Sequence, residues 1–171
     1  TLCHSNLGLP AALSAVVTKV KRRKVHFEFV IANQLARYWL IPSHPDIKSE
    51  LDLQGMAGLG FRRQFGEDSA EWKIRISQEP LGEMLAVALP KLLLSQIDQF
   101  VSNNGLIVLS IRPEISDLWQ AVNARLKEYT WLAFAGSEKI MICGFENSQL
   151  KLIRQVSHAL LIENAQFEAW I

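Results

Sequence analysis

The chain has 171 residues, of which 49% are hydrophobic and 20% charged, and its formal net charge at pH 7 is +1. A chain of this length folds as one domain, or as two small subdomains that share an interface, around a real hydrophobic core. The near-neutral charge argues against a generic nucleic-acid-binding protein, which usually carries a strongly basic surface. No apolar run reaches the roughly 20 residues that cross a bilayer, so no membrane-spanning helix is predicted.

The first predicted element is an N-terminal helix that begins at Pro10 and ends near residue 21. Its positive charges follow the apolar stretch, whereas a secretory signal carries them before it. Two interpretations of this basic cluster stay open. It contacts an anionic membrane or a partner, or it is a solvated helix end whose cations complement the helix dipole. The cluster consists of Lys21, Arg22, Arg23 and Lys24.

Two β-rich runs between residues 24 and 41 flank the polar pair Asn33-Gln34. The first run alternates, which is typical of a half-buried strand, and the short polar connection predicts a β-hairpin. Pro42 and Pro45 then stop the second strand. The apolar face of the first strand would hold Val25, Phe27, Phe29 and Ile31, opposite His26 and Glu28.

A helix is predicted from Ser49, its N-cap, to Phe65. Its three glycines do not form a phosphate loop, because G-M-A-G-L-G has the wrong spacing and no convincing strand precedes it. Close packing of the helix on a sheet explains them better. The expected apolar stripe comprises Leu51, Met56, Leu59 and either Phe61 or Phe65.

The next stretch alternates strands and helices. A strand with one polar face is predicted at 72–76, and a strand that is apolar on both faces, hence central, at 84–89. Pro90 then begins a helix that runs through Phe100 and is closed by the turn at 103–105. A buried strand at 106–111 and a helix at 115–126 follow. This order predicts a right-handed parallel crossover of α/β type.

Three strands in quick succession, at 130–135, 140–145 and 149–156, predict a meander. After Ser157 the chain has the pattern of a helix start and ends in an apolar segment that contains Trp170. That side chain either docks on a partner or folds back into a groove of its own domain. Cys143 is expected as a buried reduced thiol, with a disulfide to Cys3 as the alternative.

Three stretches carry a resemblance to a known family. They are V-H-F-E-F-V-I-A-N-Q-L-A-R-Y-W-L-I-P, then W-K-I-R-I-S, then L-A-V-A-L-P-K-L-L-L-S-Q-I-D-Q-F-V-S-N-N-G-L-I-V-L-S-I-R-P-E-I. In this order they resemble the actin-like cytoplasmic platform proteins of type IV pilus and type II secretion machines. The resemblance implies an α/β fold with a ribonuclease-H-like mixed sheet, one half of the actin fold, with helices packed on it and a three-stranded meander after it. The expected division is an N-terminal helix and basic segment (1–23), a ribonuclease-H-like subdomain (24–128), and the meander with its tail (129–171).

Actin-like ATPases bind phosphates and magnesium with an acidic residue and glycines in each of two hairpin turns. The first equivalent turn here, V-I-A-N-Q-L-A-R, has no acid and no glycine. The second, F-A-G-S-E-K, keeps Gly136 and Glu138 but is too short to enclose a triphosphate. We therefore expect no nucleotide and no other cofactor.

Other catalytic patterns are missing from the sequence. A ribonuclease-H enzyme needs several converging carboxylates, whereas Glu28 is the only acid in the first pair of strands. No serine lies in a G-x-S-x-G motif, although a dispersed triad needs no sequence proximity. The four histidines, His4, His26, His44 and His158, show no metal-site spacing.

The resemblance thus implies a non-enzymatic scaffold in the cytoplasm, at the inner face of a bacterial inner membrane. Its partners would be the assembly ATPase and inner-membrane platform proteins, and nucleic acid is not expected. Arg37, Arg75 and Arg112 are candidate polar contacts or simply exposed strand residues. The alternative functions are an actin-like nucleotide-binding ATPase with atypical phosphate loops, or a small-molecule sensor whose pocket leaves no sequence signal.

Overall fold

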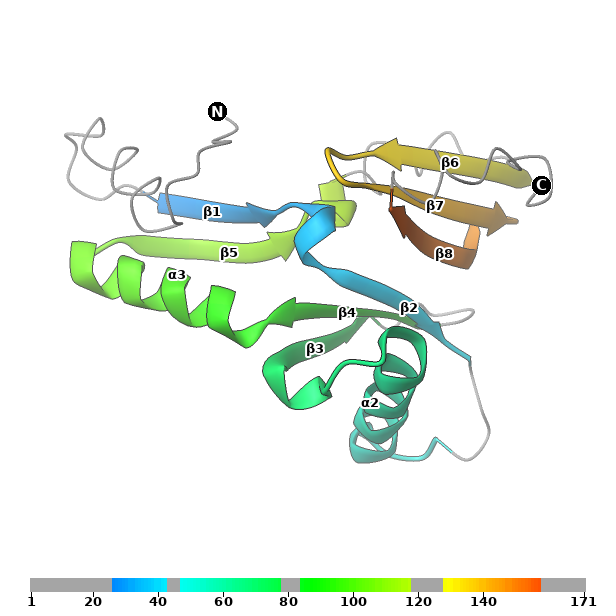
Figure 1. Cartoon of the computed structure of the whole chain (residues 1–171), viewed down its shortest axis with the longest axis horizontal. Helices are drawn as coiled ribbons and strands as arrows, with labels where there is room; N and C mark the ends of the chain where they lie inside the picture. Colours follow the sequence, from blue (N-terminus) through cyan, green and yellow to red (C-terminus); the bar gives the residue numbers. More distant parts are fainter. Residues whose placement is uncertain (1–25, 43–46, 78–83, 118–127, 158–171) are drawn as a thin grey trace.

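The computed structural model describes residues 26–42, 47–77, 84–117 and 128–157 (Figure 1). The predicted N-terminal helix, most of the helix at 115–126 and the C-terminal tail lie outside these residues, as do Lys21 to Lys24 and Trp170. The elements are β1 (His26–Ile31), η1 (Asn33–Leu35), β2 (Arg37–Ile41), α2 (Glu50–Phe65), η2 (Ser69–Glu71), β3 (Trp72–Ser77), β4 (Met84–Pro90), α3 (Lys91–Asn104), β5 (Ile107–Pro113), β6 (Tyr129–Ala135), β7 (Lys139–Glu146) and β8 (Gln149–Ser157).

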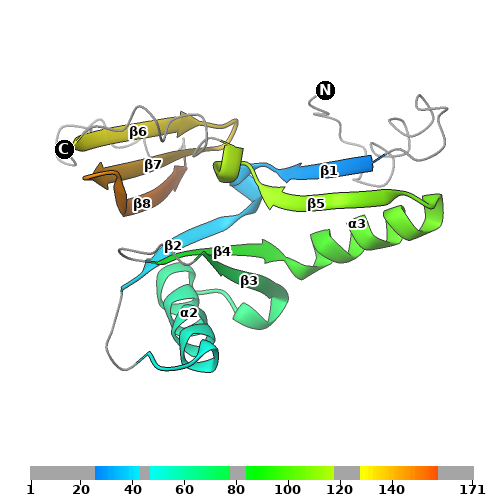
Figure 2. The same cartoon turned by 180° about the vertical axis from the view of Figure 1, so that it is seen from behind.

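The described strands form three sheets, with the orders β1-β5, β2-β4-β3 and β6-β7-β8. The predicted hairpin of the first two strands is wrong. β1 pairs in parallel with β5, and β2 pairs antiparallel with β4. A two-residue hairpin turn needs residues that adopt positive φ, and Asn33-Gln34 instead begins a 3-10 turn that sends β2 away from β1 (Figures 1 and 2).

The parallel crossover predicted between β4 and β5, the strands before and after α3, is also wrong, because these two strands do not pair. β4 is the centre of its own antiparallel sheet, as its apolar sequence predicted, but β5 joins β1 rather than β4. α3 connects the two sheets and ends at Gly105, which has the left-handed φ of 59° that the Asn-Gly turn predicted. The prediction that β5 is buried is wrong for Ile107 and Leu109, which are 44% and 59% exposed.

Helix α2 covers one face of the β2-β4-β3 sheet. Its N-cap is confirmed, because the Ser49 side chain accepts a hydrogen bond from the Asp52 N–H. The buried residues are Leu53, Ala57 and Phe61, four positions apart, so the helix approaches the sheet over the small Ala57. The predicted stripe is wrong at Leu51 and Leu59, which are 81% and 62% exposed.

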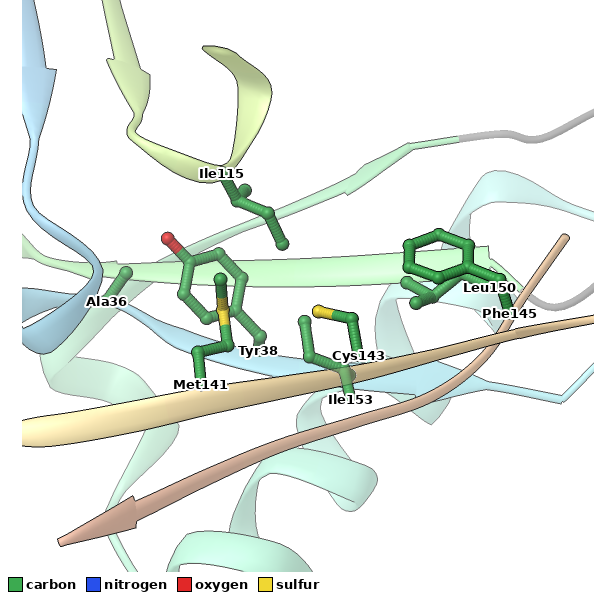
Figure 3. Packing of buried hydrophobic residues seen from close by; sticks show 8 residues of the cluster. All are labelled: Ala36, Tyr38, Ile115, Met141, Cys143, Phe145, Leu150 and Ile153. Atoms are coloured by element: carbon green, nitrogen blue, oxygen red, sulfur yellow. The ribbon is translucent and has the colours of Figure 1, made fainter. Parts of the chain in front are cut away.

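The meander covers the opposite face of the same sheet, and its three predicted strands are confirmed (Figure 3). Figure 3 shows Tyr38 of β2 beside Met141 of β7, with Ile115 above the tyrosine ring and Cys143 next to Ile153. Cys143 is a buried free thiol, as expected, and its burial raises its pKa to about 12. The core on this face comprises Ala36, Tyr38, Ile115, Met141, Cys143, Phe145, Leu150 and Ile153.

The fold therefore has β2 and β4 as a shared middle layer, with α2 on one side and the meander on the other (Figures 1 and 2). Within the described ranges, no helix has the length and apolar character needed to cross a bilayer. The division of the chain at residues 23/24 and 128/129 stays a prediction.

Candidate functional site at two facing turns

The two turns that correspond to phosphate-binding turns lie against each other. The first is the η1 turn, residues 32–36, and the second is the β6–β7 turn, residues 135–139. The Ser137 hydroxyl donates a 2.7 Å hydrogen bond to Oε1 of Gln34, which links the two turns directly. The sequence predicted both turns as the place to look, and the structure brings them together although about 100 residues separate them.

Asn33 is the centre of the polar contacts at this junction. Its side-chain Oδ1 accepts a 2.7 Å hydrogen bond from the Tyr38 hydroxyl, and its carbonyl accepts a 2.8 Å hydrogen bond from Nε2 of Gln155. Its backbone N–H donates to Oε2 of Glu114 at 3.1 Å. Residues from η1, β2, β8 and the end of β5 are thus joined at one residue, through its side chain and its backbone.

The Glu114 carboxylate was missed by the sequence reasoning, which searched the turns themselves for acids. Glu114 follows directly on β5, and its own N–H donates to the carbonyl of Ile31 at 2.9 Å. The signal that could have found it is the parallel pairing of β1 with β5, which brings the ends of both strands to the same edge. Without that pairing, nothing in the sequence connects residue 114 with residue 33.

Four backbone N–H groups of the two turns donate to protein acceptors. Besides Asn33, the N–H groups of Leu35 and Ala36 donate to the carbonyls of Ala32 and Asn33, and that of Gly136 donates to the carbonyl of Lys139. A phosphate-binding turn instead directs its N–H groups outward toward the anion. Here a carboxylate already takes one of these donors, and its negative charge opposes a second anion at the same place.

Electrostatics keep the Tyr38 hydroxyl in its donor form. Burial raises its pKa well above the usual value, and the nearby Glu114 carboxylate raises it further. Lys139, which leaves the second turn, has a lowered pKa, mainly because it is partly buried and also because Arg37 is close. At Asn33 the side-chain donors are the neutral Tyr38 hydroxyl and Gln155 amide, and Glu114 supplies the carboxylate.

Arg37, a predicted contact residue, is engaged within its own domain. Its guanidinium lies over the Trp72 ring, 5.0 Å from the centroid, and over Phe65 at 5.9 Å. Its Nε and Nη2 donate to Oε1 of Glu67 at 3.1 and 3.0 Å. These contacts hold the β2 edge to the end of α2, so Arg37 contributes to packing there.

The three predicted arginines lie on three different surfaces. Arg112 of β5 pairs with Glu28 of β1 at 3.4 Å and with Asp117, on the two-stranded sheet. Arg75 of β3 is aligned through Val87 with Tyr38, so it lies on the meander side of the sheet. Arg37 is aligned through Ala88 with Ile74, so it lies on the α2 side.

Of the three predicted arginines, Arg75 is the exposed one. It is exposed on β3 together with Lys73 and Ser77, and we call these three residues the β3 shelf. Across the described part of the chain, neither cation of the shelf forms an ion pair. β3 thus extends the meander-side face of the sheet with two uncompensated positive charges.

The described residues contain no group of three or more His, Cys, Asp or Glu side chains that could hold a metal ion. Glu138 of the second turn is exposed. The two facing turns can accept hydrogen bonds, and the β3 shelf offers positive charge. These are the strongest chemical features of the described surface.

No family model matches the sequence, and no curated protein matches it. Among solved structures, the chain is similar to the cytoplasmic domain of EpsL, an inner-membrane component of the type II secretion system of Vibrio cholerae. The TM-score is 0.59 at 12% identity, over 92% of this chain and 60% of that one.

Two further structures show the same likeness. A PilM-PilN type IV pilus biogenesis complex matches with a TM-score of 0.60 at 13% identity, over 91% of this chain and 51% of that one. A Bacteroides thetaiotaomicron protein with an actin-like ATPase fold and unknown function matches with a TM-score of 0.59 at 16% identity, over 97% of this chain and 65% of that one. This chain thus spans between half and two thirds of the solved chains. The α/β class and the actin-like fold expected from the sequence are confirmed.

Proposed function

We propose that this chain is a non-enzymatic, partner-binding module of a type IV pilus or type II secretion platform, acting at the cytoplasmic face of the inner membrane. In this role it holds the assembly ATPase and membrane components together and hydrolyses nothing. The proposal is supported by the likeness in fold to EpsL and to PilM-PilN, and by the chemistry of the two turns.

The observation that carries the proposal is the direct closure of one turn on the other. Ser137 bonds to Gln34, and the Glu114 carboxylate takes the Asn33 N–H. A nucleotide would have to break these contacts and bring its phosphates next to a carboxylate. The Asn33–Glu114 contact is partly buried, and loss of the partner of such a group costs about 1–3 kcal/mol, so this contact opposes nucleotide binding.

Thermal unfolding with and without Mg-ATP tests this proposal. A ligand at about 100 times its dissociation constant stabilises a folded protein by about 2.7 kcal/mol, a readily measured shift. We expect no change in the melting temperature up to millimolar Mg-ATP. The Glu114→Gln variant, which removes the negative charge, is the matched control. If Mg-ATP raises the melting temperature of the unmodified chain and Ser137→Tyr abolishes this increase, the chain is an actin-like nucleotide-binding protein instead.

The β3 shelf is the surface that we assign to a partner. Two exposed cations beside the half-buried Val87 and Leu89 of β4 suit an acidic segment with apolar side chains. Arg75→Glu reverses the charge there. Arg63→Glu makes the same charge reversal at an exposed position of α2 and is the control. We expect Arg75→Glu alone to weaken partner capture from native membranes about tenfold, the effect of losing about 1.4 kcal/mol. Equal capture by both variants would remove the shelf from the proposal.

A further inference from the structure

The strand that carries the β3 shelf is an edge of its sheet. β3 pairs antiparallel with β4, and within the described residues no strand pairs with its other side. In Figures 1 and 2, β3 lies below β4, at the margin of the sheet. Its burial alternates over all six residues, so it is a regular strand. The open edge of a regular strand offers a row of backbone N–H and C=O groups to another chain.

The register with β4 identifies the backbone groups that face this open edge. Trp72 is opposite Pro90, which has no N–H, and the Trp72 N–H donates to the carbonyl of Ser69. Trp72 and Pro90 therefore cannot form a pair that exchanges two backbone hydrogen bonds. Because such pairs alternate along an antiparallel ladder, the N–H and C=O groups of Ile74 and Ile76 face away from β4.

The exposed side chains of β3 restrict which strand can pair with it. Lys73 and Arg75 lie on the same face, and within the described residues neither has an ion-pair partner. At the other edge of the sheet, by contrast, Arg37 of β2 bonds to Glu67. Like charges opposite each other destabilise a pair of strands, so the two cations of β3 oppose pairing with a second copy of β3. An acidic strand is instead favoured.

We propose that an extended acidic peptide of a partner protein adds to the open edge of β3 as an antiparallel strand, which gives the sheet order β2-β4-β3-peptide. Two acidic side chains, two positions apart, lie opposite Lys73 and Arg75. The peptide backbone bonds to the outward groups of Ile74 and Ile76. This mode of binding rests on the partner-binding role proposed above, and it specifies the chemistry of the partner.

The two kinds of position in the new ladder suit these contacts. Pairs without mutual hydrogen bonds have Cα atoms about 4.5 Å apart, compared with about 5.5 Å in hydrogen-bonded pairs. Lys73 and Arg75 occupy the closer pairs, so acidic side chains opposite them come within easy reach. The hydrogen-bonded positions lie opposite Ile74 and Ile76, which are half-buried in the core on the α2 side. Apolar side chains of the peptide extend that core, so the expected pattern alternates acidic and apolar residues.

Binding of the end-blocked, fluorescently labelled peptide T-V-E-V-E-V tests this arrangement. Placed antiparallel with its threonine opposite Ser77, the peptide has its glutamates opposite Arg75 and Lys73. Fluorescence anisotropy during titration with the 171-residue chain should show saturable binding. The control peptide T-V-K-V-K-V should bind at least about tenfold more weakly. The double variant Lys73→Glu with Arg75→Glu should invert this preference, and its melting temperature should equal that of the unmodified chain.

Methylation of the peptide backbone distinguishes strand addition from attraction between charges alone. N-methylation of the first two valines removes the N–H groups that bond to Ile76 and Ile74, and it should weaken binding at least about tenfold. N-methylation of the two glutamates removes N–H groups that face away from β3. It should change the dissociation constant by less than about twofold.

Three outcomes overturn the proposal: no binding of T-V-E-V-E-V, no inverted preference in the double variant, and equal effects of the two methylation patterns. The melting response to Mg-ATP depends on the two facing turns and not on β3. Strand addition and the proposed non-enzymatic function can therefore fail separately, and the two experiments show which one has failed.

Discussion

The two faces of the β2-β4-β3 sheet are covered in different ways. On the α2 side, Trp39, Phe61, Phe65 and Trp72 pack edge to face or tilted, with centroids 5.2–5.9 Å apart. All of them come from residues 39–72. On the meander side, Tyr38 meets Met141 and Ile153, which are more than 100 residues away.

The two faces of the sheet also differ in the polarity of the contacts that cover them. The meander side ends in the hydrogen-bonded junction around Asn33, and the Tyr38 hydroxyl reaches into it. On the α2 side, Arg37 bonds to Glu67 at the edge of the sheet, and the buried indole N–H of Trp39 finds no acceptor in the described structure. One face is thus held by packing among aromatic rings close in the sequence, and the other by packing between distant segments with a polar rim. The four experiments below separate these two contributions.

The most damaging change to the α2 side is Phe61→Ala. Phe61 is fully buried and contacts three aromatic rings, so its loss leaves a cavity and should cost about 3–5 kcal/mol in the free energy of unfolding. Urea denaturation measures the loss. Leu59→Ala, on the exposed side of the same helix, should change stability by less than about 0.5 kcal/mol. Similar losses for both would mean that α2 is not packed through Phe61.

Alkaline pH should weaken the meander side. The pKa of the Cys143 thiol is raised from 9.0 to about 12, so the folded state keeps a proton that the unfolded state releases. Its contribution is complete below pH 9 and declines as the pH rises toward 12, by up to about 1.4 kcal/mol per pH unit. Between about pH 9 and pH 11 the unmodified chain should lose about 2 kcal/mol more than Cys143→Ala does. If the free energies of unfolding of the two proteins fall equally with rising pH, this account is wrong.

Tyr38→Phe removes the hydrogen bond that ties the meander-side core to the junction. Asn33 loses the donor to its Oδ1, while the ring keeps its packing, so the expected cost is about 1–2 kcal/mol. Tyr129→Phe deletes the same group from an exposed ring and should cost nothing measurable. Urea denaturation of the two variants gives the comparison, and a neutral Tyr38→Phe would show that the junction does not contribute to stability.

The smallest effect separates two glycines of α2. Gly55→Ala should stabilise the chain by about 0.5–1 kcal/mol, because alanine favours the helix and nothing lies within 4 Å of the new Cβ. Gly60→Ala should gain nothing, because its Cβ would lie 3.0 Å from Nε1 of Trp39. Thermal melting measures both. Equal gains would mean that α2 does not approach the sheet at residue 60.

The sequence predicted the local elements well, since their signals are local. Ser49 as an N-cap, Gly105 as a helix end, the polar face of β3 and the three meander strands follow from neighbouring residues and are confirmed. Strand pairing is different. The partner of β1 is decided by competition among all apolar strands, and nothing in residues 24–41 distinguishes β5 from β2 as that partner.

The candidate site also has features that neighbouring residues predicted and features that only long-range pairing creates. Both turns were recognised as chemically unsuited to phosphate from their own residues, but Glu114 and Gln155 enter the junction through long-range pairing. Arg37 looked like a free cation on an exposed strand, whereas Trp72, Phe65 and Glu67 surround it only once α2 is in place. Side-chain environments that several distant elements create could not be derived from spacing alone.

The long separation between Tyr38 and Ile153 has a consequence during synthesis on the ribosome. At about 5–20 residues per second, β2 leaves the ribosome roughly 6–23 seconds before β8 is complete. During that interval the apolar side of β2 and β4 faces water or a chaperone, while α2 can already dock on the other side. The nascent protein therefore passes through a half-covered stage, which ends when β7 and β8 have emerged.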